Sequence, residues 1–382
     1  MGALTFFLIA GEPSGDKLGA ALMAGLGQLH PAVTFTGIGG PLMQAQGMTS
    51  LFPMEELSVM GLAEVLPKYL PLKRRIVQAA EAAVAAKPAA LITIDSPDFC
   101  LRVAKLVKAA KPDLRTIHYV APSVWAWRPK RAAKMAGGID HVLALLPFEP
   151  PYMTAAGMTC DFVGHPVVAE ALASVAEREA FAQTQRPMIL CLPGSRKSEV
   201  TRLAPIFGQA LMLMAEKHPH LSVVLPTLPH LADLVQSLTQ DWVAKPRLIL
   251  EPFEKRAAFA MADVALAASG TVSLELAANQ TPMVIAYAMH PFSFWAMKRM
   301  ALIDTVTLVN LVAESRSVPE LLGPACMPQA IADALQAVLA DSTAQREAMQ
   351  TTMHRLGQGG EAPGLRAARS VLAHLPPLAT RT

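Results

Sequence analysis

The sequence lacks the cysteine pairs, the long apolar runs and the charge imbalance that mark several classes of protein. Its four cysteines are widely separated and form no CxxC pair, so neither a zinc site nor a disulfide framework is indicated. No run of about 18 uninterrupted apolar residues occurs, which argues against a membrane-spanning helix. The net charge is only +3, so composition gives no general argument for nucleic-acid binding. We therefore expect reduced cysteines, no metal site and no nucleic-acid partner.

The sequence does contain a regular alternation of short apolar runs and helical patterns in both of its halves. Its 382 residues fit two domains, and 52% hydrophobic residues is a globular composition. Such alternation is typical of parallel sheets with right-handed crossovers. We predict an α/β protein with two Rossmann-like domains at 1–166 and 187–345, joined by a helical linker at 167–186. Helices at 346–382 would pack back on the first domain or on a second subunit.

The stretch 263–277 joins a strand pattern to a helical pattern through a Ser-Gly-Thr turn. Ser269 is predicted to cap the helix, which leaves the N–H groups of Gly270, Thr271 and Val272 facing solvent. A helix start of this kind attracts phosphate. Glu275, four residues after Thr271, would lie on the same face and could accept hydrogen bonds from a ribose. The alternative is an ordinary capped turn followed by a solvated glutamate.

Two further polar features of the second half could join this stretch. Gly194, Ser195 and Arg196 follow the strand predicted at 188–192, and an arginine can fork onto two phosphate oxygens. Asn310 lies in an apolar stretch, where a buried amide serves either as a structural post or as a ligand contact. Together these residues indicate a nucleotide-diphosphate site that need not involve a metal, because no Asp-x-Asp cluster is evident.

In the first half, carboxylates follow the strands predicted at 4–10 and 89–94. Ligands of doubly wound sheets bind outside the carboxyl ends of the strands, so Asp98 stands where a general base could act. A helix cap is the plainer role for Asp98. Glu12 and Asp16, which follow the first strand, are rival carboxylates.

The segment 51–72 is apolar, is interrupted by prolines and is followed by a basic cluster at 73–75. This combination suits the surface of an anionic membrane, and a helix packed on the sheet is the alternative. The side chains proposed for membrane contact are Leu62, Leu66, Tyr69 and Leu70. A second segment that combines apolar and basic residues, at 292–300, contains Trp295, Lys298 and Arg299.

Seven short motifs occur in order along nearly the whole chain, apart from its C-terminal end. They are GEPSGD at 11–16, ELSVMG at 56–61, DSPDF at 95–99, HYVAPSVWAWR at 118–128, PGSR at 193–196, ASGT at 268–271 and PFSFW at 291–295. Each motif is weak alone, but the ordered set resembles the lipid-A-disaccharide synthases, inverting glycosyltransferases of family 19 with the GT-B fold. Ala288 departs from that family, which carries a basic residue at this place.

The resemblance implies a hexosyltransferase of lipid A and lipopolysaccharide biosynthesis. It would move 2,3-diacylglucosamine from UDP-2,3-diacylglucosamine to the 6-hydroxyl of 2,3-diacylglucosamine 1-phosphate, giving the β(1→6) disaccharide 1-phosphate and UDP. By similarity, Asp98 is the candidate base, Arg196 and Asn310 act near the donor phosphates, and Glu275 binds the ribose. The resemblance implies no cofactor.

The resemblance also implies where the protein would work. It would be cytoplasmic and peripheral on the cytoplasmic face of the inner membrane of a Gram-negative bacterium, in contact with its phospholipids. Family members can exchange C-terminal segments between subunits, so a homodimer is a candidate assembly.

Two other functions fit part of the sequence. A UDP-N-acetylglucosamine 2-epimerase would share the fold and the nucleotide site, but it would not explain the segment at 51–75. A non-catalytic nucleotide-binding or membrane scaffold protein is the third hypothesis.

Overall fold

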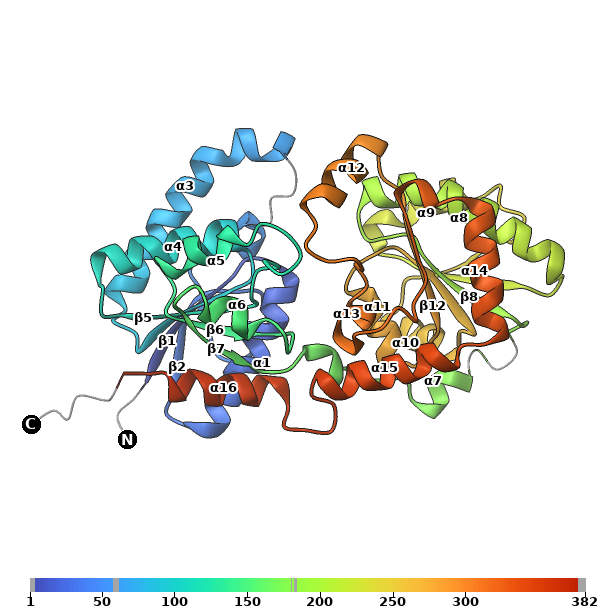
Figure 1. Ribbon diagram of the computed structural model, residues 1–382. Coiled ribbons are helices and arrows are strands. Elements are labelled where there is room, and N and C mark those ends of the chain that lie inside the picture. Colours follow the sequence, from blue (N-terminus) through green and yellow to red (C-terminus); the bar gives the residue numbers. More distant parts are fainter. Residues whose placement is uncertain (1–3, 58–61, 180, 182–183, 377–382) are drawn as a thin grey trace, which may run out of the picture. The chain divides into compact units, whose positions relative to one another are not determined.

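The computed structural model of the chain describes residues 4–57, 62–179, 181 and 184–376, and for residues 62–70 it describes the backbone only. The chain divides into two compact units. Unit 1 consists of Met1–Ala169 and Gly359–Thr382, and unit 2 consists of Glu170–Gln358. Each unit is built on a parallel sheet covered by helices, which confirms the predicted pair of Rossmann-like domains (Figure 1).

The sheet of unit 1 has the strand order β3-β2-β1-β4-β5-β6-β7. Its strands are β1 Thr5–Ala10, β2 Thr34–Ile38, β3 Thr49–Ser50, β4 Ala90–Ile94, β5 Arg115–Tyr119, β6 His141–Ala144 and β7 Thr159–Phe162. Strand β1 contributes Phe6 and Leu8 to the core on one face, and Phe7 and Ile9 to the core on the other. Burial on both faces explains why this strand is an unbroken apolar run in the sequence.

Helices cover both faces of the sheet of unit 1. They are α1 Pro13–Leu29, α2 Pro41–Ala45, α3 Leu62–Ala85, α4 Pro97–Ala110, α5 Lys130–Ala136, α6 Pro150–Thr154 and α16 Pro363–Ala373, with the single-turn helices η1 Met54–Leu57 and η2 Pro166–Ala169. Buried side chains of α3, α4 and α5 form one core with the sheet. Those of α1 and α16 form the core on the opposite face.

The last helix, α16, lies along α1 (Figure 1). The two helices meet at glycines, because a Cβ on Gly25 would lie 2.7 Å from the carbonyl oxygen of Gly364. Polar contacts hold the docked helix: Ser370 Oγ lies 2.8 Å from His141 Nε2 and donates to Asp161 Oδ2 at 2.7 Å. Burial lowers the pKa of His141 to about 4, so its imidazole is neutral near pH 7.

The sheet of unit 2 has the Rossmann order β10-β9-β8-β11-β12-β13. Its strands are β8 Met188–Leu192, β9 Ser222–Pro226, β10 Arg247–Ile249, β11 Val264–Ala267, β12 Met283–Tyr287 and β13 Glu320–Leu322. Its helices are α7 Val175–Glu179, α8 Lys197–Lys217, α9 Ala232–Thr239, α10 Pro252–Met261, α11 Val272–Ala278, α12 Pro291–Met300, α13 Leu308–Ala313, α14 Pro328–Ala340 and α15 Thr343–Arg355, with the short η3 Pro229–Leu231 and η4 Gly323–Ala325. Helices α8, α9 and α14 form one core with the sheet, and α10, α11, α13 and α15 lie on its other side (Figure 1).

The segment between the two sheets does not form the helix predicted at 167–186. Its described part contains only η2 and α7. No residue of α7 is buried, and a helical composition without a buried face supports only a short helix. The division between the units falls inside this segment, and the final two helices separate, with α15 in unit 2 and α16 in unit 1. No helix among the described residues is both long and apolar enough to cross a bilayer.

Candidate functional site

Two of the predicted polar turns emerge side by side in unit 2. Strands β8 and β11 are neighbours, with Leu192 paired to Ala267, and the Ala268 N–H donates to the Leu192 carbonyl at 2.8 Å. The strand order reverses its direction between these two strands, which is where open parallel sheets bind ligands. The turns at 193–196 and 268–271 therefore form one candidate site at the carboxyl edge of the sheet.

The turn at 193–196 is held by a glutamate that none of the sequence motifs singles out. Glu199 Oε2 accepts from the Ser195 N–H at 3.3 Å, and Glu199 Oε1 lies 3.4 Å from Arg196 Nη1. Gly194 has φ +117°, and a Cβ there would lie 2.6 Å from the Glu199 carboxylate. The Arg196 side chain remains 64% exposed, so its guanidinium can still reach an anion. The N-cap of α8 is Arg196, which is not a residue type of the capping box, so no capping motif in the sequence marks Glu199.

The turn at 268–271 differs from the prediction in its cap. Helix α11 begins at Val272 and its N-cap is Thr271, not Ser269. The chain already turns at Gly270, whose carbonyl accepts from Ser273 Oγ at 3.0 Å, so the helix starts later than the serine suggests. Among the described residues, no group accepts a hydrogen bond from the N–H of Gly270 or Thr271. These two donors are therefore available to a ligand.

Glu275, the predicted ribose contact, forms an ion pair in the structure. Lys255 of α10 places its Nζ 2.7 Å from Glu275 Oε2, with the two side chains 45% and 33% exposed. The lysine offsets the repulsion that a lone carboxylate would exert on a bound phosphate. Lys255 was not foreseen, because it comes from a separate helix and no spacing in the sequence relates it to Glu275.

Asn310 has a structural role, because its side-chain amide is fully engaged in hydrogen bonds within the protein. Its Nδ2 donates to Thr305 Oγ1 at 3.2 Å and to the Val318 carbonyl at 3.0 Å, while its Oδ1 accepts from the Val318 N–H at 3.0 Å. The residue is 1% exposed. Both amide protons are used inside the protein, so a direct contact of this side chain with the donor phosphates is not supported. Of the two roles left open by the sequence, the structure favours the first.

A basic side chain from another element contacts Ala288. Arg202 of α8 donates from Nη1 to the Ala288 carbonyl at 3.3 Å. Ala288 directly follows β12, which is the neighbour of β11. A guanidinium therefore stands at the same sheet edge as the two turns, although it comes from a different element than the resemblance suggests.

Unit 1 has its own reversal of strand order, between β1 and β4. Ala10 pairs with Ile94, so the turns that follow these strands are in contact. A Cβ on Gly11 would lie 2.7 Å from Ser96 Oγ, so the two turns approach each other closely at this glycine. Asp95 and Ser96 both have positive φ, at 51° and 43°. Two such residues in succession store backbone strain, which clusters at functional sites.

The three candidate carboxylates of unit 1 have different surroundings. Asp98 is exposed in the first turn of α4, and among the described residues no group pairs with its carboxylate. Glu12 is half-buried at the N-cap of α1. Asp16 is 3% exposed and accepts from the N–H groups of Gly40, Leu42 and Met43 at 2.9 to 3.0 Å. These contacts give Asp16 the role of capping α2, and they make it the weakest candidate for a base.

A buried glutamate organises the next two loops of the same sheet edge. Glu149 Oε1 accepts from Trp125 Nε1 at 3.2 Å, and Oε2 accepts from the N–H groups of Leu145 and Leu146 at 3.1 and 3.0 Å. Burial raises the pKa of Glu149 to about 7 despite these three donors. Glu149 thus ties the loop after β5 to the loop after β6, and no motif in the sequence marks it.

Residues 62–72 of the predicted membrane segment form the start of α3, whose backbone continues through Pro67 and Pro71 without a break, whereas Met54–Leu57 form η1. The side chains of Leu62, Leu66, Tyr69 and Leu70 lie outside the described residues. In the adjoining basic cluster, Arg75 pairs with Glu56 at 2.7 Å and stacks over the Phe52 ring at 4.3 Å. Lys73 and Arg74 are exposed.

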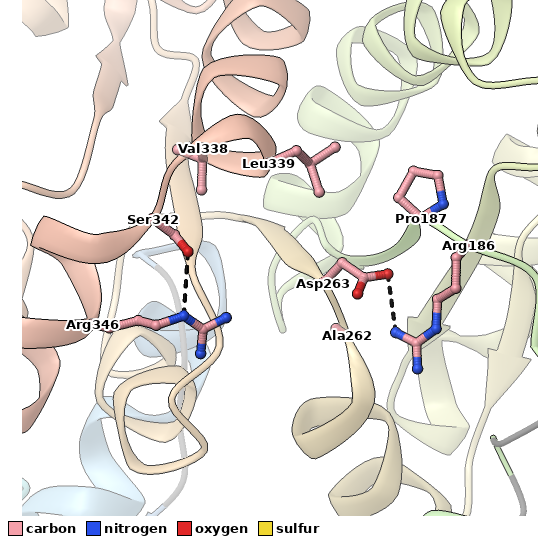
Figure 2. Close-up of a pocket in the computed structure, with 8 residues that line it drawn as sticks. All are labelled: Arg186, Pro187, Ala262, Asp263, Val338, Leu339, Ser342 and Arg346. Atoms are coloured by element: carbon pink, nitrogen blue, oxygen red, sulfur yellow. Dashed lines mark hydrogen bonds and ion pairs between the residues drawn. The ribbon is translucent and has the colours of Figure 1, made fainter.

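A pocket of about 470 Å³ lies at the opposite edge of the sheet of unit 2 (Figure 2). It is lined by Arg186, Pro187, Ala262, Asp263, Val338, Leu339, Ser342 and Arg346. Its charged groups are already engaged: Arg186 pairs with Asp263 at 3.0 Å, and Arg346 donates to Ser342 Oγ at 3.2 Å (Figure 2). Arg186 and Pro187 precede β8, and Ala262 and Asp263 precede β11, so the pocket lies at the amino ends of these strands and is separate from the turns at their carboxyl ends.

Comparison with known proteins identifies the family. Residues 6–372 match the protein family described as Lipid-A-disaccharide synthetase. The chain is 60% identical to the lipid-A-disaccharide synthase of Ruegeria pomeroyi, in an alignment that covers 97% of this chain and 95% of that protein. It is 46% identical to the synthase of Rhodospirillum centenum, with the same coverage of both chains.

Solved structures with a similar fold are much more distant in sequence. A UDP-N-acetylglucosamine 2-epimerase assigned in Listeria monocytogenes gives a TM-score of 0.63 at 14% identity, covering 97% of this chain and 95% of that one. MurG of Acinetobacter baumannii gives 0.51 at 13% identity, covering 96% and 94%. These likenesses concern the fold alone, which is GT-B. The sequence matches over nearly the whole length show that the chain belongs to the lipid-A-disaccharide synthase family of glycosyltransferases.

Proposed function

We propose that this protein transfers 2,3-diacylglucosamine from UDP-2,3-diacylglucosamine to the 6-hydroxyl of 2,3-diacylglucosamine 1-phosphate. The products are the β(1→6) disaccharide 1-phosphate and UDP. Two observations together support the proposal. The family match covers residues 6–372, and two turns with groups that can bind a ligand lie side by side after β8 and β11, where the strand order of unit 2 reverses. The chemistry requires one site that holds a diphosphate and one base that acts on a hydroxyl.

The turns after β8 and β11 are suited to the diphosphate of the donor. The exposed Arg196 guanidinium can fork onto phosphate oxygens and stabilise the negative charge that develops as UDP departs. The N–H groups of Gly270 and Thr271 supply neutral donors beside it. Glu275, balanced by Lys255, is the proposed ribose contact. Proteins of the same fold have been crystallised with UDP-GlcNAc and with UDP, which is consistent with this use of the fold.

Asp98 is the proposed general base. In an inverting transfer its carboxylate takes the proton of the acceptor 6-hydroxyl while that oxygen attacks the anomeric carbon. The bond from the anomeric carbon to the UDP oxygen breaks in the same displacement, and the electron pair leaves with UDP. Asp98 suits this role because its carboxylate is exposed and unpaired among the described residues. Glu12 is the remaining rival.

The proposed substrates carry acyl chains, so the protein must reach a membrane surface. We propose peripheral binding to the cytoplasmic face of the inner membrane through the start of α3. Support comes from the apolar sequence of this helix, which is followed by the exposed side chains of Lys73 and Arg74. A basic end beside an apolar helix favours anionic phospholipids.

The test is an assay with defined acylated donor and acceptor, in which both UDP and the disaccharide are measured. We expect equal amounts of the two products, and we expect no epimerised UDP-sugar. Conversion of UDP-N-acetylglucosamine to its 2-epimer without disaccharide formation would contradict the proposal. The epimerases share the fold at 14% identity, so this control separates the two activities directly.

A further inference from the structure

Helix α12 of unit 2 carries large apolar side chains on its outer surface. Phe292 is 69% exposed, Trp295 is 55% exposed and Met300 is 52% exposed, and Leu302, just past the helix end, is 59% exposed. No residue of this helix is buried. Single exposed apolar residues are common, but a group of four within eleven residues marks an interaction surface.

The outer face is fixed in place by contacts on its inner side. Phe294 lies against the backbone of Gly323, where a Cβ would stand 2.5 Å from its ring. At the start of the helix, His290 Nδ1 accepts from the Phe292 N–H at 3.3 Å. The helix is therefore anchored through one aromatic residue while Phe292 and Trp295 remain outside.

The charges on this helix have one sign. Residues 291–303 contain no aspartate or glutamate, whereas Lys298 and Arg299 are both exposed. The Arg299 guanidinium lies 5.2 Å from the centre of the Trp295 ring, and the rings of Phe292 and Trp295 stack at 5.9 Å. Exposed aromatic rings with adjacent cations are the combination that binds the headgroup region of an anionic bilayer.

We propose that the outer face of α12, defined by Phe292, Trp295, Arg299 and Met300, binds the surface of an anionic phospholipid bilayer. This contact belongs to unit 2 and is additional to the one proposed for α3 in unit 1. A second copy of the chain fits this face less well, because a symmetric contact would bring Arg299 and Lys298 against their own copies. The positive charges of this face therefore attract anionic phospholipid headgroups, and they would repel the same face of a second copy.

The location within unit 2 gives the contact a purpose. Helix α12 follows β12, and β12 is the sheet neighbour of β11. The helix therefore starts from the same carboxyl edge as the turns proposed for the donor. With α12 on the bilayer, an acylated donor would leave the membrane close to the turns that bind its diphosphate. This role of the contact rests on the proposed function. The binding itself does not depend on the reaction.

The first test measures binding of the full-length protein to vesicles of phosphatidylethanolamine and phosphatidylglycerol. The double variant Phe292→Ser/Trp295→Ser should bind on the order of tenfold more weakly than the wild type, given the apolar area that the two rings bury. Val243→Ser is the matched control, because Val243 is also 69% exposed and lies elsewhere in unit 2. This control should bind as the wild type does. Unchanged binding of the double variant would overturn the proposal.

The second test locates the contact with Trp295 fluorescence. Trp125 and Trp242 are buried and Trp127 is 37% exposed, so a Trp127→Phe background leaves Trp295 as the exposed tryptophan. Vesicles with brominated acyl chains should quench its emission, and adding Trp295→Phe should abolish that quenching. A face that instead joins two protein copies would leave the emission unquenched, and Phe292→Ser would then convert a dimer to a monomer without lipid. If vesicles quench Trp295 emission but the protein forms no disaccharide, the membrane contact of α12 stands and the proposed reaction is refuted.

Discussion

At the scale of single residues, the buried carboxyl of Glu149 predicts how the stability of the folded protein depends on pH. Its carboxyl is buried in the folded protein, where the pKa rises from 4.5 to about 7. Between these two values the unfolded chain releases the proton and the folded chain keeps it. Stability should therefore fall as the pH rises from about 4.5 to 7, by roughly 3 kcal/mol in total, and should then level off. Glu149→Gln keeps the shape and removes the ionisation, so this part of the pH dependence should disappear.

Melting temperatures of the wild type and of Glu149→Gln, measured across that range of pH, check the sign of the effect. Glu216→Gln is the control, because Glu216 is exposed. Its pH profile should follow that of the wild type. A profile for Glu149→Gln parallel to the wild type would show that the carboxylate is ionised in the folded protein at all these pH values.

The same scale shows which site residues the sequence could reveal. Arg196, Gly270 and Glu275 belong to turns whose residue types indicate anion or ribose binding. Lys255 and Glu149 carry no such mark, because their partners come from other elements and only the fold brings them together. A sequence cannot rank candidates that differ only in such partners: Asp16 and Asp98 both follow strands, and the contacts of Asp16 with the start of α2 separate them.

At the scale of elements, the docking of α16 on α1 depends on one close approach. A Cβ on Gly25 would lie 2.7 Å from the backbone oxygen of Gly364, whereas a Cβ on Gly27 of the same helix meets nothing within 4 Å. Gly25→Ala should therefore push α16 away and destabilise unit 1 by about 1 to 3 kcal/mol. Gly27→Ala should be neutral or stabilise the helix by up to about 1 kcal/mol.

Denaturation of both variants measures this difference, and limited proteolysis shows whether α16 is the element that detaches. Cleavage in the connection at 357–362 should become faster in Gly25→Ala alone. Equal behaviour of the two variants would mean that the contact between the helices adjusts without cost.

The sequence predicts the existence of most strands and helices better than it predicts the residues at which they begin and end. The alternation of apolar runs and helical patterns predicted both parallel sheets, because strands buried on two faces are continuous apolar runs. The sequence predicts the cap of α11 at Ser269, and the cap lies at Thr271, because each residue of a Ser-Gly-Thr turn is an acceptable cap and the local hydrogen bonds decide between them. The helix predicted at 167–186 failed because helical composition does not show whether a buried face exists.

At the scale of the whole molecule, each unit has one reversal of strand order, and each reversal carries a different chemistry. The reversal in unit 1 has a strained turn and an exposed carboxylate, whereas that in unit 2 has an exposed guanidinium and open N–H donors. Binding of the leaving group and activation of the acceptor should therefore be separable by mutation, because the residues that serve them belong to separate compact units.

This separation can be measured with UDP alone. Arg196→Ala should weaken UDP binding about tenfold to a hundredfold, since a charge-assisted contact to phosphate is lost. Asp98→Asn should leave UDP affinity unchanged and lower kcat by on the order of 10² to 10⁴, as expected for loss of a general base. Arg247→Ala, which removes an exposed arginine paired with Glu254 at the sheet edge, is the control for a general change of charge. If Glu12→Gln abolishes turnover while Asp98→Asn stays active, the base is Glu12. Loss of UDP affinity in Asp98→Asn would mean instead that the two units do not divide the reaction in this way.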